Sequence, residues 1–285
     1  MTTTTTVSAV LTRSSGFLRD VASHSLQPYR GCPLGRSLCG VGCYVQHNPW
    51  ITHGRPWGSF LEARVNAADA YRAAYHRERA WTRRARVEFA IFLSSATEPF
   101  PPQETRLGIT RSILQAMRDL PPDTLILQTH SPLILDSLEL LVDLARSCRL
   151  RVHVSIETDR ERLPGLPPPA FSIDQRFTAA ARLKHAGLFT VITVAPLLPI
   201  ADPDGFFARV AASADAVVLD HFIAGDGSPT GSRTRSTPLP AAMAAVDPAS
   251  IELAYRDQMG AIAERYLPGR VGYHAAGFAA RWGRA

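Results

Sequence analysis

Three cysteines lie close together near the start of the chain, in the segment GCPLGRSLCGVGCYVQHNPW of residues 31–50. They are Cys32, Cys39 and Cys43, and the one other cysteine of the chain is Cys148. Closely spaced thiolates bind zinc or iron–sulfur clusters, or act as redox groups. The first residues have neither the basic start nor the apolar block of a secretory signal, so metal or redox chemistry is favoured over disulfide bonds.

Two kinds of metal site fit this spacing. A catalytic iron–sulfur cluster can use three cysteines and leave one iron open for a substrate, whereas a structural zinc ion is closed by four protein ligands. The fourth zinc ligand would be His47, which gives the pattern C-x6-C-x3-C-x3-H. The glycines of the loop let its backbone wrap closely around a cluster and donate N–H groups to sulfur.

Apolar, strand-like runs alternate with amphipathic segments along the rest of the chain. The pattern predicts six strands, in residues 21–29, 86–95, 124–131, 151–158, 188–199 and 215–222. It predicts helices in residues 58–84, 102–120, 132–148, 172–187, 202–214 and 250–267. This repetition indicates an α/β fold with parallel strands, as an open doubly wound sheet or as a full or partial βα barrel. No G-x-G-x-x-G follows a strand, which argues against a nucleotide-binding Rossmann domain.

Polar residues gather at the carboxyl ends of the predicted strands, where βα barrels carry their active sites. These ends hold Pro28, Tyr29 and Arg30, then Ser94, Ser95, Thr97 and Glu98, then Gln128, Thr129, His130 and Ser131, then Ser155, Glu157 and Thr158, then Ala195 and Pro196, and last Asp220 and His221. For any single residue, the simple explanation is that the ends of strands are exposed to solvent and favour polar side chains. Together with a three-cysteine loop at the same rim, they indicate one polar site.

The charge and hydropathy of the sequence limit the classes of partner and location that it fits. The formal net charge of +6 and the pI near 9.5 would suit a nucleic-acid partner, but also an arginine-rich solvated surface. The densest basic cluster is ERAWTRRARVEF, residues 78–89. No run of about 18 apolar residues occurs, so we expect no membrane-spanning helix and a cytoplasmic protein. Residues 1–20 are predicted to be a disordered tail.

The segment QPYRGCPLGRSLCGVGCYVQ resembles the cluster loop of the radical S-adenosylmethionine family, in particular its spore photoproduct lyase-like branch. That branch reads N-P-Y-x-G-C-x3-C-x2-C-Y, and the matching residues here are Pro28, Tyr29, Gly31, Cys32, Cys43 and Tyr44. Other segments resemble the branch in the same order: SSATEPFPPQE (94–104), ITRSIL (109–114), QTHSPLILDSLELL (128–141), HVSIET (153–158) and VAPLLPIADPD (194–204). The resemblance covers about residues 24–222.

The resemblance implies a partial (βα)6 TIM-like barrel over residues 21–222, with residues 223–285 as a C-terminal extension that covers it. It implies that Cys32, Cys39 and Cys43 bind a [4Fe-4S] cluster whose fourth iron is chelated by S-adenosylmethionine. One electron, from a donor such as flavodoxin or ferredoxin, then cleaves the sulfonium to methionine and a 5′-deoxyadenosyl radical, which abstracts hydrogen from the substrate. The implied cofactor contacts are Tyr44, Ser95, Thr97, His130, Ser155 and Ala195.

The chain departs from the branch in three places. Its cysteine spacing is C-x6-C-x3-C, so the loop is longer. His130 stands where the branch has a lysine, so a hydrogen bond from imidazole would replace a lysine contact to the S-adenosylmethionine carboxylate. Residues 94–97 hold no cysteine, whereas spore photoproduct lyase uses one near that segment as hydrogen-atom donor, so we expect a different reaction. The substrate stays open between a nucleic-acid base, a peptide and a small metabolite, and no catalytic residue is assigned.

Overall fold

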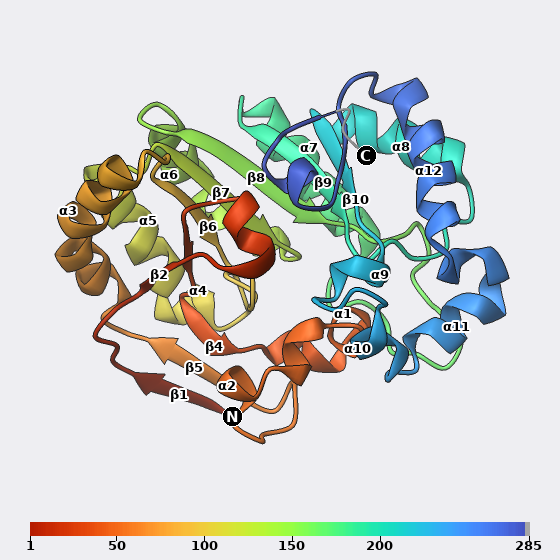
Figure 1. Cartoon of the computed structure of the whole chain (residues 1–285), viewed down its shortest axis with the longest axis horizontal. Coiled ribbons are helices and arrows are strands. Elements are labelled where there is room, and N and C mark those ends of the chain that lie inside the picture. Colours follow the sequence, from red (N-terminus) through yellow and green to blue (C-terminus); the bar gives the residue numbers. More distant parts are fainter. Residues whose placement is uncertain (283–285) are drawn as a thin grey trace.

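The main sheet of the computed structural model, which describes residues 1–282, has eight strands in the order β2-β3-β6-β7-β8-β9-β10-β11 (Figure 1). Neighbouring strands from β3 to β11 are parallel, and β2 pairs antiparallel with β3. The bounds are β2 Leu11–Arg13, β3 His24–Leu26, β6 Ala90–Leu93, β7 Thr124–Thr129, β8 Arg149–Ser155, β9 Phe189–Val194, β10 Ala216–Leu219 and β11 Val271–Tyr273. The predicted α/β fold with parallel strands is confirmed.

Helices cover the outer face of this sheet, as Figure 1 shows. The longer ones are α3 Ala67–Ala85, α5 Ile109–Asp119, α6 Leu138–Ala145, α7 Ile173–His185, α8 Pro203–Ser213 and α12 Leu253–Tyr266. Strand side chains alternate between faces, so Leu125 and Leu127 of β7 join the outer core while Ile126 between them points inward. Helix α7 begins with a capping box in which Ser172 and Gln175 exchange side-chain-to-backbone hydrogen bonds.

The inner face of the sheet is curved around a second hydrophobic cluster. Helix α13 (His274–Phe278) contacts both β6 and β10, since the rings of Phe278 and Phe92 lie 6.1 Å apart and a Cβ atom on Gly277 would lie 3.1 Å from the side chain of Val218. In a flat sheet β6 and β10 would lie about 19 Å apart at the usual spacing of about 4.8 Å per strand. The sheet therefore curls as a barrel wall does. Its edge strands β2 and β11 do not pair in the described residues, so this barrel is partial.

The prediction of a disordered tail at residues 1–20 is wrong. Strand β1 (Thr2–Thr5) pairs parallel with β5 (Leu61–Arg64), which pairs antiparallel with β4 (Tyr29–Gly31), and these three strands form a small second sheet. Strand β2 and a 3-10 turn at Gly16–Asp20 complete the segment. The threonine run reads as low-complexity sequence, but threonine is β-branched and favours strands once an edge is available for pairing.

Three predicted helices are shorter than expected. Residues 58–84 include strand β5 before α3 begins. Residues 102–120 are divided by Gly108, whose φ of 62° ends α4 (Glu104–Leu107) before α5 starts. Residues 132–148 open with a 3-10 turn, Pro132–Ser137, before α6.

The C-terminal segment, predicted as an extension of the barrel, folds into several short helices and one strand. It contains α9 (Phe222–Gly225), α10 (Ser232–Arg235) and α11 (Leu239–Val246), and the 3-10 turn Pro248–Ile251 precedes α12. Strand β11 then extends the sheet beside β10. Among the described residues, no helix combines the length and the apolar character that crossing a membrane requires.

Candidate active site

A cavity of about 410 Å³ opens at the carboxyl ends of the parallel strands. Residues that follow β6, β7, β8, β9 and β10 all contribute to its wall, and the loop after β4 closes it from the other side. The predicted site residues on this wall are Cys32, Cys39, Cys43, Tyr44, Ser95, Thr97, His130 and Ala195. The structure therefore brings together, in one cavity, residues that are spread over most of the sequence.

The cysteine loop is folded into short helical turns that use the extra residues of its long spacing. Turn Pro33–Arg36 separates Cys32 from helix α1 (Leu38–Val41), which carries Cys39, and Cys43 precedes a turn at Tyr44–His47. The turns pack so closely that a Cβ atom on Gly40 would lie 2.1 Å from the backbone of Gly35. The C-x6-C-x3-C spacing is thus compatible with three cysteines that face one cavity.

Electrostatics disfavour the thiolate forms of these cysteines when no cation is bound. All three are free, and burial raises the pKa of Cys32 to about 12, with the neighbouring Cys39 adding to the rise. Burial followed by the proximity of Cys39 likewise raises the pKa of Cys43. Three neighbouring thiolates in a buried site repel one another, and iron or zinc would relieve that repulsion.

The three cysteines, which all lie within the described residues, are not arranged around one metal ion. Ligands of one zinc ion all lie about 2.3 Å or less from it, whereas the three cysteines of a cluster each bind a different iron and lie further apart. Within residues 1–282, no three Cys, His, Asp or Glu side chains are arranged to hold one metal ion. His47, the fourth ligand of the zinc alternative, is exposed and lies outside the cavity wall. The geometry gives no support to the zinc site.

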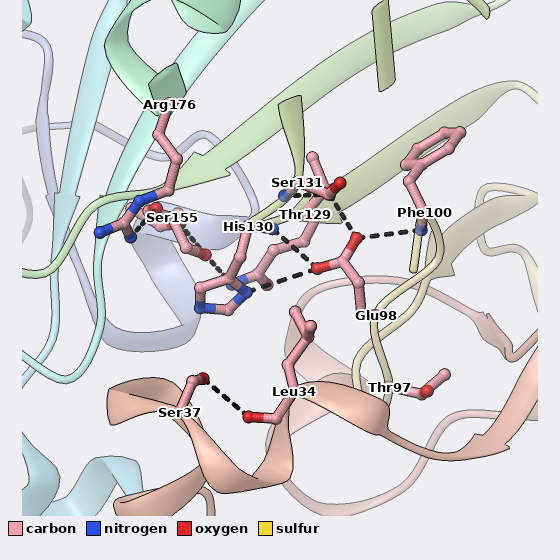
Figure 2. A network of polar contacts seen from close by, with 12 residues as sticks. Leu34, Ser37, Thr97, Glu98, Phe100, Thr129, His130, Ser131, Ser155 and Arg176 are labelled. Atoms are coloured by element: carbon pink, nitrogen blue, oxygen red, sulfur yellow. Dashed lines mark hydrogen bonds and ion pairs between the residues drawn. The ribbon is translucent and has the colours of Figure 1, made fainter. Parts of the chain in front are cut away.

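A buried carboxylate, Glu98, organises the wall beside the cysteines (Figure 2). Its Oε1 accepts hydrogen bonds from the backbone N–H of Phe100, at 3.0 Å, and from the hydroxyl of Thr129. Its Oε2 accepts the backbone N–H of His130 at 2.8 Å and lies 3.6 Å from the Nδ1 of the same histidine. These bonds fix the chain that follows β6 to the chain that follows β7.

A second buried carboxylate, Glu157, holds the other edge of the His130 ring. The Nε2 atom of His130 lies 3.0 Å from Oε1 of Glu157, and Oε2 of Glu157 forms a 2.7 Å ion pair with Nη1 of Arg176. The same Arg176 nitrogen donates to the carbonyl of Ser155 at 2.8 Å. Burial lowers the pKa of His130, but the charges of Cys39 and Glu157 outweigh it, and the net pKa is well above its ordinary value. The position of the ring between Glu98 and Glu157 thus favours its protonated, cationic form at the cavity wall.

The other predicted cofactor contacts differ in how directly they reach the cavity. The hydroxyl of Tyr44 donates to the carbonyl of Ser95, and the hydroxyl of Thr97 donates to the carbonyl of Gly31, so both side chains fasten the cysteine loop to the end of β6. Ser155 is fully buried and is not on the cavity wall.

Ser155 lies behind the cavity wall and contacts other side chains. Its hydroxyl accepts the side-chain amide of Gln128 at 3.1 Å and lies 3.0 Å from the hydroxyl of Thr193. It can therefore orient Gln128, which does line the cavity, but it does not reach a ligand itself.

Two parts of the site were missed from the sequence. Arg176 lies within the amphipathic pattern of α7, where an arginine reads as a surface residue, yet it is 3% exposed. His274, which lies 2.7 Å from the cavity carboxylate Asp220, belongs to the C-terminal segment whose role the sequence left open. No local pattern marks either residue, because both are placed by contacts with distant parts of the chain.

Comparison with known proteins supports the fold. No family model and no curated protein matches this chain by sequence. A structure of a spore photoproduct lyase mutant with dinucleoside spore photoproduct has a TM-score of 0.61 at 15% identity, over 96% of this chain and 80% of that chain. Spore photoproduct lyase complexed with dinucleoside spore photoproduct has a TM-score of 0.59 at 17% identity, over 96% of this chain and 81% of that chain. The chain therefore has the fold that its sequence motifs implied.

Proposed function

We propose that this protein is a radical S-adenosylmethionine enzyme of the spore photoproduct lyase-like branch. One observation carries the proposal. Three cysteines from a single loop, in a segment that resembles the cluster loop of that branch, face one cavity at the carboxyl ends of the parallel strands. The fold shared with spore photoproduct lyase supports it.

In this proposal Cys32, Cys39 and Cys43 hold a [4Fe-4S] cluster, and the cavity holds S-adenosylmethionine beside it. When bound, the reduced cluster supplies the electron that divides S-adenosylmethionine into methionine and a 5′-deoxyadenosyl radical able to abstract hydrogen. The protein positions the cofactor and keeps water away from the reacting atoms. The loop closes over the strand ends and is fastened there by the Tyr44 and Thr97 hydroxyls, which suits that role.

His130 takes the place of the lysine of the branch. Its imidazolium ring is held between Glu98 and Glu157, so its orientation is fixed before a ligand arrives. A fixed cationic donor costs little reorganisation when it binds a carboxylate. We propose that His130 receives the carboxylate end of S-adenosylmethionine, with Ser95 and Ala195 on the wall around it.

The reaction differs from spore photoproduct repair in this proposal, because residues 94–97 offer no cysteine as hydrogen-atom donor. A nucleic-acid base is one candidate substrate, and the net charge of +6 favours it mildly. The enzyme would need a one-electron donor such as flavodoxin or ferredoxin, and we place this exchange in the cytoplasm.

Cysteine variants test the proposal. We expect the protein, reconstituted anaerobically with iron and sulfide, to bind about four irons per chain and to absorb in the visible range. Cys39→Ala should lose this cluster. Cys148→Ala is the matched control, since Cys148 lies outside the cavity with its Sγ 3.5 Å from the carbonyl of Leu144. Equal iron contents in the two variants would contradict the proposal.

A further inference from the structure

The cavity wall is acidic. Four carboxylates line it, and each of these residues is at most 5% exposed: Glu98, Glu157, Asp220 and Asp226. No lysine or arginine lies among the described residues of the wall, where His130 and His221 are the basic side chains. His221 accepts the N–H of Ile223 on Nδ1, so its ring is held neutral with Nε2 donating to the carbonyl of Ser250. An anionic ligand group would find only His130 as a cationic partner.

Three of the four carboxylates have partners on both oxygens. Those of Glu98 are occupied by backbone N–H groups and Thr129, and those of Glu157 by His130 and Arg176. Asp226 accepts hydrogen bonds from Ser228 on Oδ1 and from the N–H of Thr234 on Oδ2. Its carboxylate therefore stabilises the loop that contains it.

Asp220 is different. Its Oδ1 lies 2.7 Å from Nδ1 of His274, yet among residues 1–282 no hydrogen bond reaches this buried oxygen, and none reaches Oδ2. A buried carboxylate oxygen without a donor is costly, and such atoms are rare in folded proteins.

His274 is held in one orientation beside this carboxylate by a second partner. The Nε2 atom of His274 is contacted by Nη1 of Arg256, which is a permanent donor, so Nε2 accepts and the ring proton is on Nδ1. The Nδ1 atom of His274 lies 2.7 Å from Oδ1 of Asp220, but the two atoms form no hydrogen bond. Arg256 in turn is anchored by Asp257, with Nε to Oδ1 at 3.0 Å. Asp220 lines the cavity, so a ligand bound there can supply the missing hydrogen-bond donor.

We propose that Asp220 anchors the substrate, through an N–H or O–H donor on a neutral or cationic group. The inference rests on the proposed function and adds to it a class of substrate. Asp220 follows β10, several strands away from the Glu98 and His130 wall where the cofactor is proposed to bind. Amides, imides, amines, amidines and hydroxyl groups fit the free oxygen, whereas a phosphate or carboxylate would be repelled there.

Three small molecules of one shape test the charge preference. Benzamidine, benzamide and benzoate share a phenyl ring and differ in their head group, and apolar side chains such as Phe222 and Phe278 line the cavity. Ligand-observed NMR titration of the full chain should give the tightest Kd for benzamidine, a weaker one for benzamide and the weakest for benzoate. Asp220→Asn should raise the benzamidine Kd at least about tenfold, since charge-assisted hydrogen bonds are roughly twice as strong as neutral ones. The benzamide Kd should change less than about threefold.

Asp174→Asn is the matched control, because it removes one carboxylate from an exposed ion pair with Arg209. Gly225→Ala is a second variant that keeps the charge, since a Cβ there would lie 3.0 Å from Oδ2 of Asp220 and crowd it. Gly225→Ala should weaken benzamidine binding. It replaces Asp220→Asn as the test variant if Asp220→Asn does not fold.

Unchanged benzamidine binding in the Asp220 and Gly225 variants, or benzoate binding as tight as benzamidine, would overturn the inference. So would an equal loss of S-adenosylmethionine affinity in Asp220→Asn, which would assign Asp220 to the cofactor. Iron content is measured separately on each variant, so a failure of the cluster proposal is distinguishable from a failure of this one.

Discussion

Replacing Arg176 by methionine tests the buried ion pair that supports His130. Arg176 and Glu157 are both nearly inaccessible, and their charged atoms lie 2.7 Å apart. Arg176→Met keeps most of the side-chain volume but leaves Glu157 buried with one cationic neighbour. Removing one partner of a buried pair costs about 3–5 kcal/mol.

The pKa of Glu157 gives an independent magnitude. Burial raises that pKa, but the charges of Arg176 and His130 more than offset the effect and hold it at about 2. A fall from about 4.5 to about 2 corresponds to about 3 kcal/mol at 1.36 kcal/mol per pKa unit. The folded-state pKa is below the unfolded one, so this stability is present above about pH 4.5 and is lost as the pH falls toward 2.

Urea unfolding at pH 7 and at pH 3 measures both effects. We expect Arg176→Met to lower the free energy of unfolding by about 3 kcal/mol at pH 7, with an unchanged urea m-value, and by less at pH 3. The control Arg146→Met breaks an exposed pair with Asp143 and should cost less than about 1 kcal/mol. The double variant Arg176→Met/Glu157→Gln should be more stable than Arg176→Met alone. A loss below about 1 kcal/mol for Arg176→Met would refute the reasoning.

Two other substitutions have defined outcomes. His153 is fully buried with no partner in the described residues for either ring nitrogen, and burial lowers its pKa to about 3, so wild-type stability falls as the pH drops from 6.5 toward 3. His153→Leu should abolish that loss and raise stability at pH 5 by about 2 kcal/mol, and parallel pH profiles of thermal unfolding would contradict this. Gly31→Ala should destabilise the cysteine loop by about 1–3 kcal/mol and reduce iron content, because its φ is 79° and its Cβ would lie 2.5 Å from the carbonyl oxygen of Phe60. Gly16→Ala, at a φ of 56° with open space around it, is the control, and equal effects would show that the crowding is unimportant.

The strands of the barrel could be predicted because each is a buried, apolar run bounded by polar residues. Ile126 and its neighbours in β7 are buried on both faces, which gives a continuous hydrophobic pattern rather than an alternating one. The position of the cavity could be predicted in the same way, because the carboxyl ends of parallel strands meet at one rim.

The parts that were missed depend on contacts between distant segments. The run Thr2–Thr5 is a strand only because the edge of β5 is free to pair with it. Arg176 is buried because Glu157 and the carbonyl of Ser155 lie opposite it. Ser155 was expected at the cavity wall, but its strand carries it behind Gln128 instead. Sequence patterns identify each of these residues but do not show which distant residue each one contacts.

The central claim is that the three-cysteine loop holds a cluster with one iron open to S-adenosylmethionine. The most direct test is the electron paramagnetic resonance spectrum of the reconstituted, reduced protein, recorded anaerobically with and without S-adenosylmethionine. We predict a reduced [4Fe-4S] signal that shifts when S-adenosylmethionine is added. A colourless protein that holds one zinc ion, and that loses it on substitution of His47, would contradict the claim.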